Sequence, residues 1–154
     1  MRILSIIVLL ASSVTVMNDS SAQTKQPEVS AKLNHIAFYV TNLDKSESFY
    51  HSLLNLEKIE EPFKDGEHVW FTLGAAGHLH LIAGVYNKME HNKNEHLCFS
   101  VRSIAEFIKK LDLQNIEYSN WPGTAKEPTI RVDGVKQIYF QDPDGHWLEV
   151  NDSK

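Results

Sequence analysis

The chain has 154 residues, which is room for one ordinary domain but not for a second large one. Hydrophobic residues make up 42% and charged residues 23%, a balance that is typical of a globular domain and excludes a wholly disordered chain. The formal net charge is -5 and the basic residues are scattered, so we expect no nucleic-acid partner.

The N-terminal segment is typical of a secretion signal. Arg2 supplies a positive charge ahead of the apolar run 3–11, which is too short to span a bilayer, and small residues precede Ala22. We therefore expect a signal peptide over residues 1–22, cleavage near Ala22 and a flexible leader over residues 23–32. The mature protein would be periplasmic or secreted, without a membrane partner; a retained anchor or a disordered tail is the alternative.

Two segments of the remaining chain resemble each other. Residues 34–40 and 95–101 both have histidine in second place, apolar or aromatic residues after it and valine last. The two histidines, His35 and His96, stand 61 positions apart (96 minus 35). A repeat of this length indicates two copies of one supersecondary unit.

Each repeat is followed by a helical pattern. Apolar residues recur on one face over residues 44–54 and again over 103–111. Asp44 and Ser103 are suitable N-caps, each with a glutamate three residues later. We predict a helix at both places.

Strand patterns then complete each unit. The strands are expected over 56–60, 68–73 and 79–83 in the first unit, and over 116–121, 135–141 and 146–150 in the second. The predicted fold class is α+β, with two paired βαβββ modules that form a curved mixed sheet around a metal-binding cleft. The domain would cover residues 33–151, with modules 33–84 and 95–151 and an inserted loop over 120–134 at the mouth of the site.

Strand alternation brings four candidate metal ligands to the cleft face. In the first strand of each module the aliphatic and aromatic neighbours suit the helix side, which leaves His35 and His96 on the other face. His80 and Glu149 each stand between two aliphatic residues on the last strand of their module. Three imidazoles and one carboxylate predict one divalent ion, with zinc, nickel, iron and manganese all open.

The same faces carry residues that could bind a small-molecule substrate. These are Tyr39, Trp70, Gln137 and Tyr139. The alternative is that the rings only fill the core. Cys98, the single cysteine, excludes an intramolecular disulfide and is assigned to packing.

Two motifs resemble a known family. The segment 139–149, with the sequence YFQDPDGHWLE, and the opening 33–37, LNHIA, are similar to the corresponding segments of the vicinal oxygen chelate (glyoxalase/bleomycin resistance/dioxygenase) superfamily. The resemblance covers residues 33–151 and is strongest to glyoxalase-I-like members. It implies a metal-dependent lyase or isomerase that acts on a substrate with vicinal oxygens through an enediolate-type intermediate, with Glu149 as ligand and proton base.

Departures from the family pattern keep other functions open. Glyoxalase I carries arginine and asparagine where this chain has Tyr39 and Gly84, and glutamate where it has His80. A fosfomycin-resistance-like thiol transferase would use His35, His96 and Glu149 and matches Tyr139, but Ala37 replaces its threonine and residues 150–154 contain no arginine. The third reading is a non-catalytic small-molecule-binding protein of the bleomycin-resistance kind.

The resemblance also implies a homodimer. Family members commonly build each site from one half of each chain, so His35 and His80 of one subunit would meet His96 and Glu149 of the other. A site built within one chain is the alternative, and His78 could replace His80 as a ligand. Two-fold dimers are the commonest oligomers.

Overall fold

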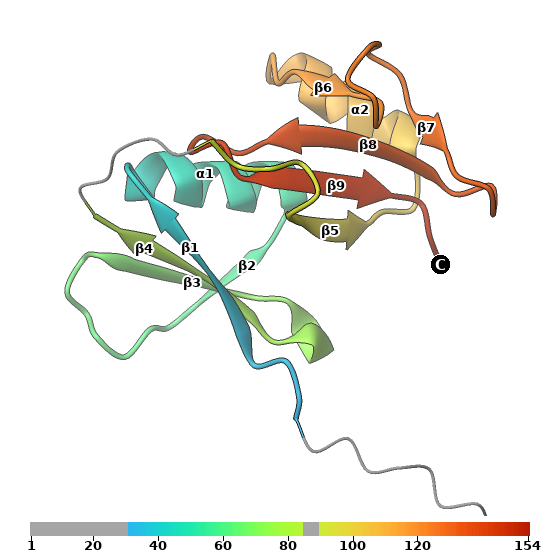
Figure 1. Cartoon of the computed structure of the whole chain (residues 1–154). Helices are drawn as coiled ribbons and strands as arrows, with labels where there is room; N and C mark the ends of the chain where they lie inside the picture. The colour runs from blue at the N-terminus through green and yellow to red at the C-terminus, as the bar shows by residue number, and fades with distance from the viewer. Residues whose placement is uncertain (1–30, 85–89) are drawn as a thin grey trace, which may run out of the picture. The chain divides into compact units, whose positions relative to one another are not determined.

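A computed structural model describes residues 31–84 and 90–154 (Figure 1). The expected signal peptide and nearly all of the expected leader lie outside the described residues. Within them, no helix is both long and apolar enough to cross a membrane. Residues 33–154 form one compact unit.

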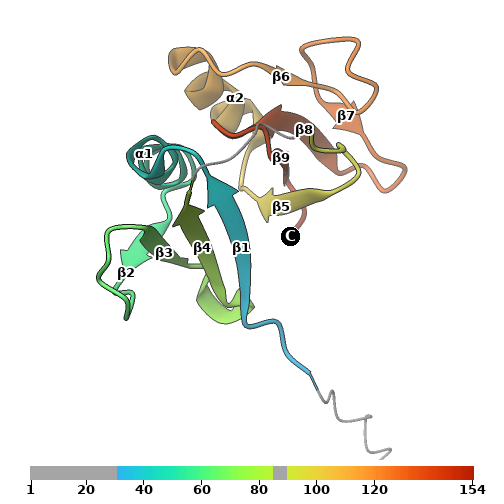
Figure 2. The same ribbon diagram turned by 60° about the vertical axis from the view of Figure 1, so that its left-hand side comes forward.

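The first module follows the predicted order. It consists of β1 (His35–Val40), α1 (Leu43–Leu54), β2 (Glu57–Ile59), β3 (His68–Thr72), a short 3-10 turn (Gly74–Ala76) and β4 (His78–Ala83). The strand order in the sheet is β1-β4-β3-β2, which Figure 2 shows from right to left. β1 pairs with β4 in parallel, whereas β2, β3 and β4 pair antiparallel.

The second module repeats this arrangement. It consists of β5 (His96–Ser100), α2 (Ile104–Leu113), β6 (Tyr118–Ser119), β7 (Thr129–Ile130), β8 (Lys136–Gln141) and β9 (Trp147–Asn151). The strand order is β5-β9-β8-β6, with β7 also paired to β8, and β5 runs parallel to β9. The α+β class and the pair of βαβββ modules are therefore confirmed, and the strands form two mixed sheets instead of one continuous sheet.

Strand register relates the two modules residue by residue. His80 lies opposite Ala37 on β1, and Glu149 lies opposite Cys98 on β5. Because Ala37 and Cys98 each follow the first histidine of their module by two residues, His80 and Glu149 occupy equivalent places. On the neighbouring strands Trp70 faces His80 and Tyr139 faces Glu149 in the same way.

One helix start differs from the prediction. Helix α1 is capped by Asn42, whose backbone is extended and whose side-chain oxygen accepts from the Lys45 N–H at 2.9 Å, so Asp44 lies inside the first turn. Asparagine and aspartate cap equally well, and only the chain direction after β1 selects between them. Helix α2 begins as predicted, with the Ser103 side chain accepting from the Glu106 N–H.

The two modules share one hydrophobic core. It is built from the alternate residues of both sheets and from one face of each helix; its fully buried large side chains are Tyr50, Phe71, Phe140, Leu53, Leu79, Leu81, Leu111, Ile138 and Leu148. The Tyr50 hydroxyl on α1 donates to Asp142 of the second module at 2.8 Å. Asp144 accepts from the Thr41 N–H and from the Thr41 and Ser46 hydroxyls. The turn between β8 and β9 is thus bound to the first module.

The inserted loop is more ordered than the sequence indicates. The predicted strand over 116–121 is reduced to β6, and the loop contains the short strand β7, which was not predicted. Asn120 is buried and its side-chain oxygen accepts from the Thr124 and Ala125 N–H groups. These bonds close the loop locally, and the Trp121 N–H donates to the Thr129 hydroxyl across it at 2.7 Å.

Candidate functional site

The first half of the candidate site is a stack of parallel rings on the first sheet. The Trp70 indole and the His80 imidazole lie 3.9 Å apart at an angle of 2°, and His80 and His35 lie 4.3 Å apart at 8°. His78 flanks the stack at 6.0 Å from His80. Strand register causes this, because all four side chains point from β1, β3 and β4 to the same face of the sheet.

Two nitrogen atoms in this stack lack partners. His80 Nε2 and Trp70 Nε1 are buried and have no hydrogen-bond partner among the described residues. Burial lowers the pKa of His80, and the neighbouring histidines His35, His78 and His68 lower it further. A neutral imidazole with an unsatisfied nitrogen is the form that binds a metal.

The stacking limits how His35 and His80 can act together. A metal ion lies close to the plane of an imidazole that binds it, and one ion cannot lie in the planes of two parallel rings at once. Rotation about χ2 of His80, a soft torsion, would open the stack and turn Nε2 outward. His35 needs no such change: its Nδ1 is 2.8 Å from the Asn34 side-chain oxygen, which leaves Nε2 as the acceptor.

The second half of the site centres on Glu149. Its Oε2 accepts from the Tyr139 hydroxyl at 2.6 Å and lies 3.2 Å from His96 Nε2. Its Oε1 accepts from Asn151 Nδ2 at 2.9 Å and from the Cys98 thiol at 3.3 Å. The carboxylate is nearly buried, with 6% of its residue surface exposed, and each oxygen is oriented by two neighbours.

These contacts determine the charge state of the group. Burial raises the pKa of Glu149, but hydrogen bonds from Tyr139, Asn151 and Cys98 and the charge of His96 together outweigh it and lower the pKa below its ordinary value. Burial and the bond to Glu149 raise the pKa of Cys98 to about 12. The thiol donates a hydrogen bond to the carboxylate. It is also exposed, so its assignment to packing was wrong.

His96 is held in the tautomer that a metal ligand needs. Its Nδ1 lies 2.8 Å from the backbone carbonyl of Lys93, which can only accept. Nδ1 therefore carries a proton, and Nε2, 3.2 Å from the Glu149 carboxylate, is the nitrogen that a metal ion would bind in place of a proton. Histidines that bind metals usually donate their other ring N–H to a carbonyl or carboxylate in this way, which fixes the tautomer and the ring orientation.

The structure brings the predicted ligands together as two pairs. His35 stacks on His80 on the first sheet, and His96 lies beside Glu149 on the second. Within one chain, over the part that the structure describes, no three His, Cys, Asp or Glu side chains form a group that could hold a metal ion. His35, His96 and Glu149 have the donor set and tautomers for a divalent ion, and His80 would join them after rotation.

The residues predicted to bind substrate surround these pairs. Gln137 is buried and donates to the Tyr139 hydroxyl at 2.6 Å, so both belong to the network around Glu149. Trp70 belongs to the stack. Tyr39 is about one-third exposed and its ring lies against Gly84, where a Cβ atom would overlap it.

Several residues of the site were not found from the sequence. Asn151 and Lys93 orient Glu149 and His96, but their strands and turns carry no motif that indicates it. His146, in the turn before β9, stacks on Phe38 at 4.4 Å, and its Nδ1 lies 2.8 Å from Asp142 Oδ2. Asp142 of the DPDG turn, whose Oδ1 accepts from the backbone N–H groups of Asp144 and His146, is the sequence signal that could have indicated a partner for His146.

Comparisons with known proteins agree with this geometry. The model of the Glyoxalase/Bleomycin resistance protein/Dioxygenase superfamily matches residues 32–150. The chain is 32% identical to metallothiol transferase FosB of Shouchella clausii (strain KSM-K16), covering 77% of this chain and 78% of that protein. It is 31% identical to glyoxylase I 4 of Arabidopsis thaliana, covering 77% and 68%. The fosfomycin resistance protein FosX of Listeria monocytogenes superposes with a TM-score of 0.65 at 25% identity, covering 82% and 94%.

Proposed function

The chain belongs to the Glyoxalase/Bleomycin resistance protein/Dioxygenase superfamily, and from this premise we propose that it is a metal-dependent, glyoxalase-I-like lyase or isomerase. The substrate is a small molecule with two adjacent oxygens. The observation that carries the proposal is the Glu149 carboxylate, which is charged, buried and oriented by Tyr139, Asn151 and Cys98, and which His96 Nε2 faces at 3.2 Å.

The proposed metal ligands are His35, His96 and Glu149, with His80 as the fourth. A divalent ion held by them acts as a Lewis acid on two vicinal oxygens of the substrate. Zinc, nickel, iron and manganese suit nitrogen and oxygen donors of this kind. The name of the FosB relative, a metallothiol transferase, supports a metal in this position.

The two pairs of ligands meet, in this proposal, between two copies of the chain. The cleft-face residues His35 and Ala37 of β1 and Cys98 and Ser100 of β5 are exposed or half-buried in the single chain. A two-fold dimer would cover both faces and bring the His35 pair of one subunit to the Glu149 pair of its partner. Each site then draws residues from both chains, as an isologous interface requires.

Complementation between inactive chains tests this arrangement. Neither His35→Ala nor Glu149→Ala homodimers have an intact site. If sites are shared, random mixing of the two unfolded chains followed by refolding restores about a quarter of the wild-type metal content, because one of the two sites in each heterodimer is intact. If every site lies within one chain, mixing restores nothing.

The proton chemistry falls to Glu149. Its lowered pKa keeps it unprotonated at neutral pH, so it can accept a proton from a carbon next to a carbonyl. The Tyr139 hydroxyl and Asn151 amide hold the carboxylate while the proton moves. Tyr39 and Gly84 replace the arginine and asparagine of glyoxalase I and contact each other, so a thiol cosubstrate would be held by other groups.

A thiol transferase of the fosfomycin-resistance kind is the second candidate. The hydrogen bond between Tyr139 and Glu149 supports it, as do the FosB and FosX relatives. In this reading Tyr139 orients the carboxylate ligand, and the substrate is an epoxide that a thiol opens.

Turnover by the metal-loaded protein distinguishes the candidates. Isomerisation of a thiohemiacetal supports the first function, and thiol addition to fosfomycin supports the second. A protein that binds these compounds unchanged, with metal and without it, would instead be the small-molecule-binding protein of the third reading.

Export, which the first 22 residues suggest, remains part of the proposal and is tested by N-terminal sequencing of the protein from its native cells.

A further inference from the structure

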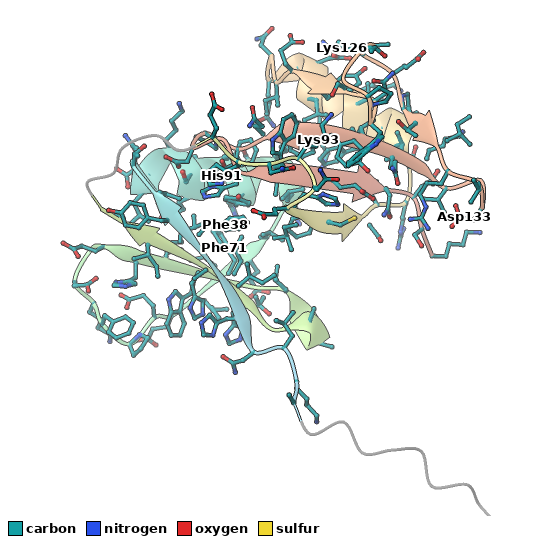
Figure 3. The ribbon with its side chains drawn as sticks, in the orientation of Figure 1. Phe38, Phe71, His91, Lys93, Lys126 and Asp133 are labelled. Atoms are coloured by element: carbon teal, nitrogen blue, oxygen red, sulfur yellow. The ribbon has the colours of Figure 1, made fainter. Side chains whose placement is uncertain are left out.

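Lys93 occupies an unusual position beside the second half-site. It lies in the turn before β5, and its ammonium group is over the rings of three aromatic residues. The distances to the ring centres are 4.8 Å for Trp147, 5.0 Å for Tyr139 and 5.9 Å for Trp121. In Figure 3 Lys93 lies over the strands β8 and β9.

The same ammonium group has hydrogen-bond acceptors for all of its protons. The Ser119 hydroxyl lies at 3.2 Å, and the backbone carbonyls of Asn120 and Trp121 lie at 3.1 Å. An ammonium group has three donors, so Lys93 is saturated and cannot also hold a substrate without leaving these partners. Burial lowers the pKa of Lys93, whereas the oxygens and the aromatic faces favour its charged form.

The backbone of Lys93 contacts the proposed metal ligand. Its carbonyl accepts the Nδ1 proton of His96 at 2.8 Å. Lys93 therefore contacts three parts of the site. Its side chain binds the inserted loop and lies over the ring of Tyr139, whose hydroxyl donates to Glu149. Its carbonyl accepts from His96. The turn is also held at His91, whose carbonyl accepts from Trp147 Nε1 at 3.0 Å.

We propose that Lys93 is a positioning residue whose anchored side chain holds its own carbonyl against His96 and holds Tyr139 against Glu149. This inference rests on the proposed function, because it assigns Lys93 a role in orienting the proposed metal ligands. Without the ammonium anchor, the turn before β5 loses its bonds to residues 119–121. The carbonyl of residue 93 would then no longer select one tautomer of His96.

A matched lysine provides the control. Lys126 lies 5.1 Å from the Tyr118 ring in the same module and pairs with Asp112 at 3.1 Å, but it touches no proposed ligand. Figure 3 shows it at the upper edge of the molecule, beyond β6. Lys126→Met removes a cation–π contact of the same kind without affecting the site.

The experiment measures Zn²⁺ affinity by competition with a chromogenic chelator, together with the His96 tautomer by long-range ¹H–¹⁵N NMR of the metal-free protein. Lys93→Met is expected to weaken Zn²⁺ binding by about tenfold or more, as the loss of a group that orients a metal ligand does. Its His96 signal should change from one tautomer to a mixture. Lys93→Arg keeps the charge, but its larger planar group does not match the three acceptors around a compact ammonium, so it is expected to lose less affinity than Lys93→Met without reaching wild type. Lys126→Met should match wild type.

Unchanged affinity and an unchanged His96 tautomer in Lys93→Met would overturn the proposal. So would an equal loss in Lys126→Met, since that would reflect a general loss of stability. If Lys93→Met does not fold, Ser119→Ala removes one acceptor of the same ammonium group and should shift both readouts in the same direction. If the wild-type protein binds no Zn²⁺, the proposed function fails, and the tautomer of His96 alone then decides the role of Lys93.

Discussion

The hydrogen bond between Tyr50 and Asp142 joins the two modules inside the shared core. Tyr50 is fully buried on α1, and Asp142 is nearly buried in the turn before β9. Burial, together with the nearby carboxylate, raises the pKa of Tyr50, so the hydroxyl stays protonated and donates. Tyr50→Phe removes this donor and leaves the ring in place.

The cost can be worked out from the partners that remain. A hydrogen bond to a charged group contributes about 1.5–3 kcal/mol. Asp142 Oδ2 keeps His146 Nδ1 at 2.8 Å, and Oδ1 keeps the N–H groups of Asp144 and His146. Because these partners remain, we expect Tyr50→Phe to lower the free energy of unfolding by the lower end of this range, about 1.5 kcal/mol. For a folded unit of this size that corresponds to a fall in Tm of about 6 °C.

Urea and thermal unfolding followed by circular dichroism measure the effect. Tyr118→Phe is the control, because the Tyr118 hydroxyl has no hydrogen-bond partner among the described residues and the substitution should change stability by less than about 0.5 kcal/mol. A Tyr50→Phe protein as stable as wild type would refute the reasoning. It would mean that the turn between β8 and β9 does not depend on its bond to α1.

Three further outcomes are expected. Gly77→Ala should destabilise the protein by about 1–3 kcal/mol in urea unfolding, because Gly77 has φ of 105° and a Cβ atom there would meet the Asn34 carbonyl; Gly66→Ala, at a positive φ with open space around it, should cost less. Burial raises the pKa of Asp144, but bonds from Thr41 and Ser46 outweigh it and lower the pKa from 3.8. The contribution of Asp144 to the free energy of unfolding is therefore complete above the pKa of this group in the unfolded chain, and it is lost as the pH falls through the lower pKa of the folded state. The difference in stability between wild type and Asp144→Asn should accordingly shrink on acidification from about pH 6 to about pH 3. His80→Ala should weaken metal binding by about tenfold or more in a chelator competition.

Each of these outcomes has a clear contrary result. Equal losses for Gly77→Ala and Gly66→Ala would show that the conformation alone, and not the Asn34 contact, sets the cost. A stability difference for Asp144→Asn that grows in acid would reverse the assigned direction of the pKa. An unchanged affinity in His80→Ala would leave a site of three ligands, with His80 only stacked on His35.

Much of the fold follows from local patterns. Alternation predicts that His35 and His96 lie on the face away from the helices. Exposure alternates along β1, with His35 exposed, whereas on β5 His96 and Leu97 are both half-buried. The repeat likewise predicts the equivalence of His80 and Glu149, since strand register preserves it. Local patterns could not select Asn42 over Asp44 as a cap, because both side chains suit the position and the direction of the preceding chain decides.

The contacts that orient the site depend on tertiary structure. The contacts of the Lys93 ammonium group bring the turn before β5 together with residues 119–121 and with strands β8 and β9, which are far apart in the sequence. No spacing rule connects them. The stack of His35 on His80 is similar: parity predicts that both lie on one face, but the parallel arrangement of the rings depends on side-chain torsions.

The central claim is a divalent metal bound by His35, His96 and Glu149. Elemental analysis of protein purified without added metal or chelator, beside the His35→Ala, Glu149→Ala double variant, tests it most directly. The account predicts about one equivalent of a transition metal per chain in the wild-type protein and its loss in a double variant that is folded by circular dichroism. Metal retained in the folded double variant, or none in wild type even after reconstitution with zinc, nickel, iron or manganese, would contradict the claim.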